Sequence, residues 1–317
     1  MPLRVDPVPA LLACDEPWVR YCTVINIIGK TPHQLEVDCA RSEMLGSPQI
    51  KQILNESAIW PDPPISRHND AKHPIHKLAF LADWGIHVGD PGIDEIIKRI
   101  LEHQEIDGSL QSSIEINRGQ LEVPSRRGWL LCDYPTLLYA ILSFGASGKR
   151  VDSAAEHLAG LVDENGWRCR GNLGFRGPGR KTDPCPYANL IALKALSLSK
   201  WRDSIEVALG VEAQLTHLEE GVKHYLFGVG SDFRKLKYPN IWYDCLHVAE
   251  VLSRIPAAKE DLRFKKMWMK IIEKQGPYGG FVSESIWKAW VNWSFGQKKQ
   301  WSPTLTCRIA LIDSRLI

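Results

Sequence analysis

Two segments of the sequence share one turn pattern, and this pattern decides the fold. They read QEIDGSL at residues 104–110 and QGPYGGF at residues 275–281, so both fit Q-x-x-x-G-x-[large apolar]. Related turns read NESAIW at 55–60, DENGW at 163–167 and EEG at 219–221. The glycine position of the pattern recurs every 50 to 58 residues. A period of this length indicates a repeated supersecondary unit.

Two kinds of helical pattern alternate between these turns. One kind is apolar on most faces and belongs in the interior, and the other is amphipathic. The apolar segments are 75–85, 135–144, 186–198, 246–255 and 304–312. The mixed or amphipathic segments are 93–101, 152–161, 201–218 and 262–272. Strictly alternating β-branched runs are scarce, so no sheet is expected.

This alternation predicts an all-α fold with about five to six helical hairpins. Such hairpins stack either into an open solenoid or into a closed ring, and a solenoid needs polar outer faces at both ends. The last helical segment, 304–312, is apolar, which favours closure. We therefore predict an α/α toroid that forms a single domain over residues 1–317, with N-terminal helices in 1–55 that pack on or complete the ring.

Composition excludes several classes of protein. The 317 residues are 44% hydrophobic and 24% charged, and a formal net charge of +2 gives no reason to expect a nucleic-acid partner. No apolar run is long enough to cross a membrane, and the first residues do not resemble a signal peptide. The eight cysteines form no CxxC pair, so reduced thiols and a cytoplasmic location are expected.

Three longer segments carry a resemblance to a known group of proteins. They read HPIHKLAFLAD at 73–83, DPCPYANL at 183–190 and YPNIWYDCLH at 238–247. With the turns, over roughly residues 50–315, they resemble the squalene and terpene cyclases and the protein prenyltransferase β-subunits. The resemblance implies the toroid fold and a central cavity lined by aromatic side chains, but no particular substrate.

The segment GFRGPGRKTDPC at 174–185 is similar to the zinc-binding segment of prenyltransferase β-subunits. That resemblance implies zinc, with Asp183 and Cys185 as ligands at the start of a helix. The family's third ligand, a histidine, has no direct match, and His247, His76 and Asp244 are the candidates. The alternative is a helix-capping aspartate beside a buried cysteine.

A second implication of the resemblance concerns substrate binding. Arg176, Arg180 and Lys181 lie just before the Asp-x-Cys pattern, where the family holds an isoprenoid diphosphate. Arginine and lysine suit phosphate oxygens, although a solvated, salt-bridged rim explains them equally well. Trp242 and Tyr243 are the expected contacts for the apolar part of a hydrophobic substrate.

Aspartates at the starts of three apolar segments are the candidate catalytic groups: Asp133, Asp183 and Asp244. In a ring these starts would meet at one mouth of the cavity. The chain lacks Asp-x-Asp-Asp and Asp-Asp-x-x-Asp, so the acid motifs of the two cyclase classes are absent.

Two other functions stay open. One is a toroid that binds lipids or peptides without chemistry, and the other is a carbohydrate-active α/α barrel with Asp133 and Asp244 as its carboxylate pair. The tryptophans at 287, 290 and 293 are expected to pack in the core, with a lid or a peripheral membrane contact as the alternative.

Overall fold

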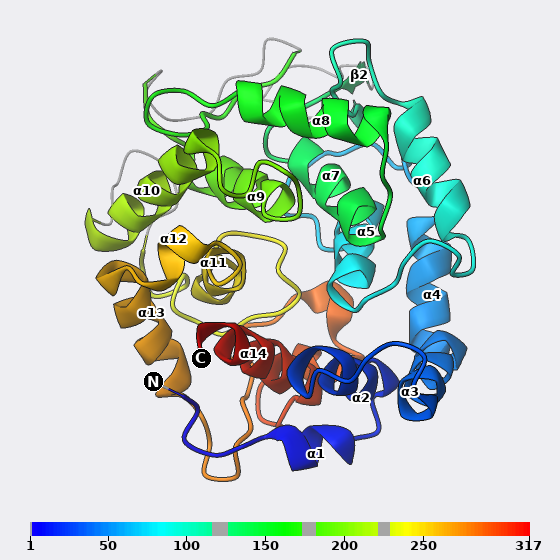
Figure 1. Cartoon of the computed structure of the whole chain (residues 1–317), viewed down its shortest axis with the longest axis vertical. Coiled ribbons are helices and arrows are strands. Elements are labelled where there is room, and N and C mark those ends of the chain that lie inside the picture. The colour runs from blue at the N-terminus through cyan, green and yellow to red at the C-terminus, as the bar shows by residue number, and fades with distance from the viewer. Residues whose placement is uncertain (1, 116–125, 173–181, 221–228) are drawn as a thin grey trace. The chain divides into compact units, whose positions relative to one another are not determined.

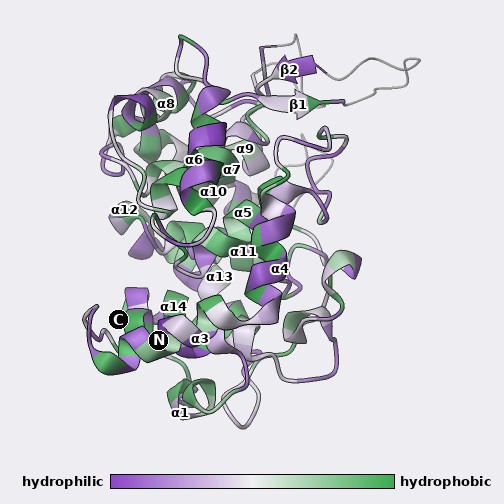
Figure 2. Cartoon of the chain, turned by 90° about the vertical axis from the view of Figure 1, so that its right-hand side faces the viewer, coloured by the Kyte–Doolittle hydropathy of each residue, from purple (hydrophilic) through white to green (hydrophobic). Residues whose placement is uncertain are grey.

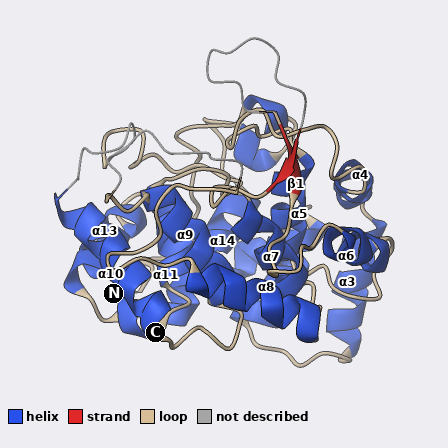
Figure 3. Cartoon of the chain, turned by 90° about the horizontal axis from the view of Figure 1, so that it is seen from above, coloured by secondary structure: helices blue, strands red, loops and turns tan. Residues whose placement is uncertain are grey.

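The computed structural model describes residues 2–115, 126–172, 182–220 and 229–317, and most of them are helical (Figure 3). The chain divides into two compact units. One is Leu54–Val229, and the other combines Met1–Ile53 with Gly230–Ile317. A single closed ring over the whole chain stays a prediction.

The described residues of the unit Leu54–Val229 contain three pairs of helices. Its apolar helices are α5 (Pro74–Asp83), α7 (Tyr134–Ser143) and α9 (Pro186–Leu196), and their partners are α6 (Ile93–Glu102), α8 (Lys149–Gly160) and α10 (Ile205–Glu220). Helix α7 packs between α5 and α9, and α9 also contacts α8 and α10 (Figure 1).

The other unit brings together the two ends of the chain. From the N-terminal part come α1 (Val8–Leu12), α2 (Pro17–Cys22), a π-helical turn (Thr23–Ile27) and α3 (Leu35–Gly46). Helix α4 (Pro48–Ser57) crosses the boundary between the units. From the C-terminal part come α11 (Cys245–Leu252), α12 (Pro256–Lys259), α13 (Leu262–Ile272), two short 3₁₀ turns (Lys288–Trp290 and Ser294–Gly296) and α14 (Pro303–Leu316). Helix α14 contacts α1, α2 and α11.

The predicted alternation of buried and half-exposed helices is confirmed. Every residue of α9 and of α11 is buried, whereas α6 buries four isoleucines on one face and exposes charged residues on the other. Figure 2 shows hydrophilic residues on the visible side of α6. Hydrophobic burial therefore fixes which helix of each pair lies inside.

The repeated turn has the same hydrogen bond in its two best copies. The Nε2 atom of Gln104 donates to the carbonyl of Gly108 at 3.0 Å, and that of Gln275 donates to the carbonyl of Gly279 at 3.0 Å. Both glycines adopt positive φ, and a Cβ on Gly108 would lie 2.5 Å from the Ser153 carbonyl oxygen. The repeated pattern therefore has a structural cause. The turn needs glycine for its positive φ, and the glutamine side chain stabilises the turn by a hydrogen bond.

The expectation of no sheet was wrong in one place. Strands β1 (Ser112–Ile114) and β2 (Arg126–Gly128) form a two-stranded antiparallel ladder. Three residues are too few for an alternating apolar pattern to emerge from the sequence.

Candidate metal centre

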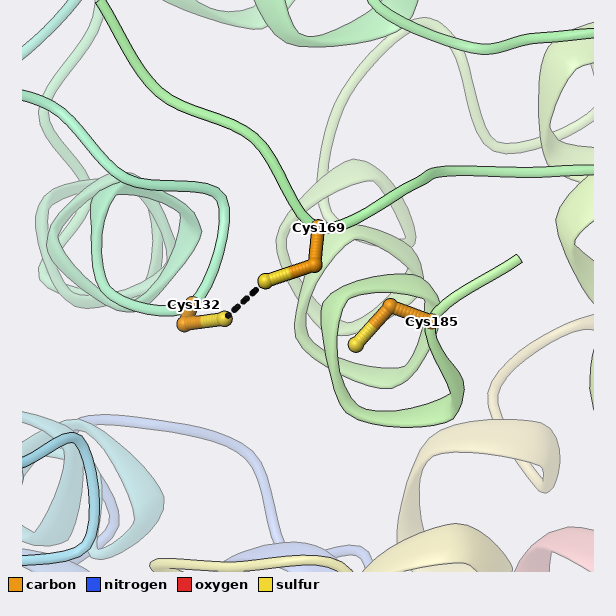
Figure 4. Close-up of side chains that lie close together, drawn as sticks. All are labelled: Cys132, Cys169 and Cys185. Carbon is orange, nitrogen blue, oxygen red and sulfur yellow. Dashed lines mark hydrogen bonds between the residues drawn. The ribbon is translucent and has the colours of Figure 1, made fainter. Parts of the chain in front are cut away.

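Three cysteine thiols meet in the unit Leu54–Val229. The sulfur atoms of Cys132, Cys169 and Cys185 all lie within 4.8 Å of one another, and the Sγ atoms of Cys132 and Cys169 are 3.6 Å apart (Figure 4). Cys132 and Cys185 are 4% and 2% exposed, whereas Cys169 is half-buried. Among the residues that the structure describes, this group has ligand types that suit a metal ion.

Local structure explains why the three thiols converge. Cys132 lies two residues before α7, and Cys185 is the N-cap of α9, the helix that packs on α7. Cys169 follows the turn at 163–167, and backbone bonds such as Leu131 N–H to the Arg170 carbonyl (2.9 Å) pair its segment with the one before α7. The Cys185 sulfur also accepts the Ala188 N–H at 3.4 Å.

The spacing of the sulfurs fits a tetrahedral thiolate site. Zinc–sulfur bonds are about 2.3 Å long, so two thiolates on one tetrahedral ion lie about 3.8 Å apart. A disulfide would need about 2.05 Å, and all eight cysteines are free thiols. Three ligands from the described residues leave a fourth position, which is the arrangement of catalytic rather than structural zinc sites.

Without a metal, the thiols of Cys132 and Cys185 stay protonated near pH 7. Hydrogen bonds with Cys169 and Cys185, together with burial, raise the pKa of Cys132 well above its usual value. A hydrogen bond with Cys132 lowers the pKa of Cys185, but the one with Cys169 and burial outweigh it and raise that pKa to about 12. Metal binding would therefore release protons, and the affinity should increase with pH.

Asp133, the first candidate catalytic residue, lies next to Cys132 and is buried. Its Oδ2 is 2.8 Å from Nδ1 of His68, which donates to it, so the side chain does not cap α7. The hydroxyl of the buried Tyr187 lies close enough that burial and then the charges of Asp133, Cys132 and Cys185 raise its pKa. An aspartate–histidine pair thus adjoins the cysteine cluster.

The histidines His73 and His76 anchor the backbone beside this pair. His73 caps α5 through Nδ1, and its Nε2 donates to the Pro63 carbonyl at 2.8 Å. His76 Nε2 donates to the carbonyl of His68 at 2.8 Å. Burial lowers the pKa of His76 to about 4, so both rings hold the 63–68 segment as neutral donors.

Asp183 does not share the thiol cluster, although it lies two residues from Cys185. It is half-buried and lines a hollow of about 390 Å³ with Pro184 and Pro186. The remaining described wall comes mainly from the turn at 163–167 and from one side of α10.

The other predicted residues lie at the start of α11, in the unit formed by Met1–Ile53 and Gly230–Ile317. Asp244 caps α11 by accepting the His247 N–H at 2.9 Å, and burial raises its pKa to about 7. His247 Nδ1 donates to the Trp242 carbonyl at 2.9 Å. Tyr243 is buried against Phe233, and Trp242 is half-buried. Asp133 and Asp244 belong to different units, so the carboxylate pair of a glycosidase is not tested.

For the basic and aromatic candidates, the structure describes some residues and leaves others out. Arg176, Arg180 and Lys181 lie outside the described residues. Arg168 lies 3.4 Å from Asp163, as in a salt-bridged rim. The tryptophan at position 290 is buried against Phe295, as expected for core packing.

Cys169 is one of the site residues that the sequence did not predict, together with His68 and, as a ligand, Cys132. It stands between Arg168 and Arg170 with no neighbouring ligand type, so its local pattern gives no metal signature. One indication was available: like Cys132 and Cys185, it lies between an outer helix and the next inner helix.

Comparisons with known proteins add little to this site. No family model matches the chain, and no curated protein does. One solved structure that resembles it is the type II terpene cyclase MstE from Scytonema in its apo form, at 14% identity and a TM-score of 0.44, covering 95% of this chain and 87% of that one. At this score the likeness carries no argument about chemistry. None of the helices in the described ranges is long and apolar enough to cross a bilayer.

Proposed function

We propose that this chain is an enzyme built around a zinc ion held by Cys132, Cys169 and Cys185. The observation that supports it is the convergence of three thiols within 4.8 Å from three separate segments. Of the ligands predicted from the sequence, this set retains Cys185. Cys132 and Cys169 take the places of Asp183 and His247.

When bound, zinc would supply a positive charge that keeps a thiol or a water deprotonated near neutral pH. The residues around it would do the remaining work. The carboxylate of Asp133 holds the His68 ring, and this pair would accept the proton that the substrate loses. Burial of Cys132, Cys185 and Asp133 would keep bulk water away from the reacting group.

The substrate class in this proposal comes from the sequence resemblance. The proposed alkyl donor is a hydrophobic isoprenoid diphosphate, with Arg176, Arg180 and Lys181 on the diphosphate, which is the leaving group. Trp242 and Tyr243 belong to the other unit, so their contact with a substrate stays an expectation from the sequence. The expected reaction is transfer of the alkyl group to a thiol.

Elemental analysis of the purified protein tests the metal. We expect one zinc per chain, and we expect Cys132→Ser, Cys169→Ser and Cys185→Ser each to lose most of it. Cys39→Ser is the matched control, because Cys39 is exposed and lies outside the cluster. Circular dichroism of each variant shows whether it still folds.

Diphosphate release from an isoprenoid diphosphate in the presence of a small thiol tests the chemistry. His68→Gln and Asp133→Asn should keep the zinc and slow the release. Zinc without any release would refute the transferase and leave the metal site. A wild-type protein without zinc, even after growth with added zinc, would refute the centre itself.

A further inference from the structure

The cysteine cluster contains a pair of sulfurs whose spacing also suits another reaction. Cys132 and Cys169 lie 3.6 Å apart, so a shift of about 1.5 Å would bring them to the length of a disulfide bond. Cys169 lies outside the helices, in a segment that backbone hydrogen bonds pair with the residues just before Cys132, so the two sulfurs are held as neighbours.

The two partners differ in their access to solvent. Cys169 is half-buried, whereas Cys132 and Cys185 are almost completely buried. A small polar oxidant therefore reaches Cys169 first.

We infer that Cys169 is an oxidative modification site, at which hydrogen peroxide drives a disulfide with Cys132. The part of this inference that concerns metal release rests on the proposed zinc centre, whereas disulfide formation does not. Peroxide is the oxidant that the reaction requires.

The chemistry balances in two steps. The Cys169 sulfur attacks one peroxide oxygen, the O–O bond breaks, and a sulfenic acid and one water form. The Cys132 sulfur then displaces the hydroxyl as a second water, and the S–S bond forms. The two sulfurs together lose two electrons, the peroxide gains them, and the two thiol hydrogens leave in water.

Disulfide formation between Cys132 and Cys169 would also affect zinc binding, through the remaining ligand Cys185. Once Cys132 and Cys169 are joined, Cys185 is the one thiolate of the cluster that remains, and a single ligand does not retain zinc. The Cys185 sulfur lies within 4.8 Å of both partners, so it is placed to attack the disulfide when a thiol reductant restores the site.

The test uses the full-length protein as purified, treated with hydrogen peroxide. Peptide mass mapping should find a Cys132–Cys169 cross-link with the mass loss of two hydrogens, and a chromogenic indicator should detect zinc release in step with it. Dithiothreitol should reverse the cross-link. Cys185→Ser should still form the cross-link, Cys169→Ser should not, and Cys39→Ser should behave as the wild type.

The outcomes separate this inference from the proposed function. If the protein holds zinc but the cluster stays reduced while Cys39 is oxidised, the inference fails and the metal centre stands. If the protein holds no zinc, the metal centre fails, and the mass of the cross-linked peptide alone decides whether the disulfide forms.

Discussion

At the scale of single residues, burial has changed the acid–base behaviour of several side chains. Asp244 shows the effect best, because it is 5% exposed and its pKa is raised from 3.8 to about 7. In the unfolded chain this carboxyl ionises near its usual value. The folded protein therefore binds the proton more tightly, and its stability falls as the pH rises from about 4 to above 7.

Asp244→Asn should stabilise the protein by about 4 kcal/mol at pH 8 and by only about 1–2 kcal/mol at pH 5, because asparagine keeps the cap and cannot ionise, whereas the wild type loses about 1.4 kcal/mol for each pH unit between its two pKa values. Urea unfolding at both pH values measures this. Asp261→Asn is the control: Asp261 also caps a helix, but Arg263 holds its pKa below the usual value, so its loss should not stabilise at either pH. A destabilisation by Asp244→Asn that is equal at pH 5 and pH 8 would contradict the prediction.

How much of the site the sequence predicted also depends on single residues. Cys185 and Asp133 were found because both stand at the start of an apolar helix, which is a local pattern. Cys169 was not found, because it reaches the site through pairing with the segment near Leu131, and such pairing leaves no local trace. Asp183 was assigned by the resemblance to the zinc-binding segment of prenyltransferase β-subunits, and the structure places it in the lining of a separate hollow.

At the scale of helices, close packing depends on small residues at particular contacts. A Cβ on Gly210 of α10 would lie 2.4 Å from the ring of Trp167, which is buried, and 3.1 Å from Leu193 of α9. Gly210→Ala should therefore destabilise by about 1–3 kcal/mol, although alanine favours a helix by about 1 kcal/mol. Gly160→Ala at the end of α8 meets nothing within 4 Å and should not destabilise. Thermal unfolding measures the stability of Gly210→Ala and Gly160→Ala. Equal changes in stability would contradict the packing argument.

A buried ion pair joins three inner helices. Lys194 of α9 lies 3.2 Å from Asp83 of α5, and the hydroxyl of Tyr139 of α7 donates to the same carboxylate at 2.6 Å. Lys194→Met leaves a buried carboxylate without its cation and should destabilise by about 3–5 kcal/mol. Removing both charges, in Asp83→Asn with Lys194→Met, should recover most of this loss in denaturant unfolding.

The control for this pair is Lys265→Met, since Lys265 pairs with Glu260 at 2.6 Å on the surface. Exposed pairs contribute about 1 kcal/mol at most, so this change should be small. A double variant that is no more stable than Lys194→Met alone would show that the lysine acts through packing rather than charge.

At the scale of the whole chain, the sequence predicted most of the helices but not their assembly. The predicted segment 262–272 coincides with α13, and 93–101 agrees with α6 within one residue, because apolar periodicity and turn glycines act locally. Ring closure depends on how the unit Leu54–Val229 meets the other unit, and no periodicity within a helix encodes that. The sequence therefore predicted the class of fold and the positions of its helices, while the toroid remains a prediction.

The two units also allow a prediction about metal removal. A ligand that binds only the folded state stabilises it, and all three proposed zinc ligands lie in the unit Leu54–Val229. Treatment with a chelator should therefore speed amide hydrogen exchange at the starts of α7 and α9, and leave α11 and α14 unchanged. Hydrogen-exchange mass spectrometry measures this, with Cys185→Ser as a metal-free reference that the chelator should not alter. Equal acceleration in both units would mean that the metal stabilises the chain as one cooperative body, and no acceleration in either would mean that the thiols hold no ion.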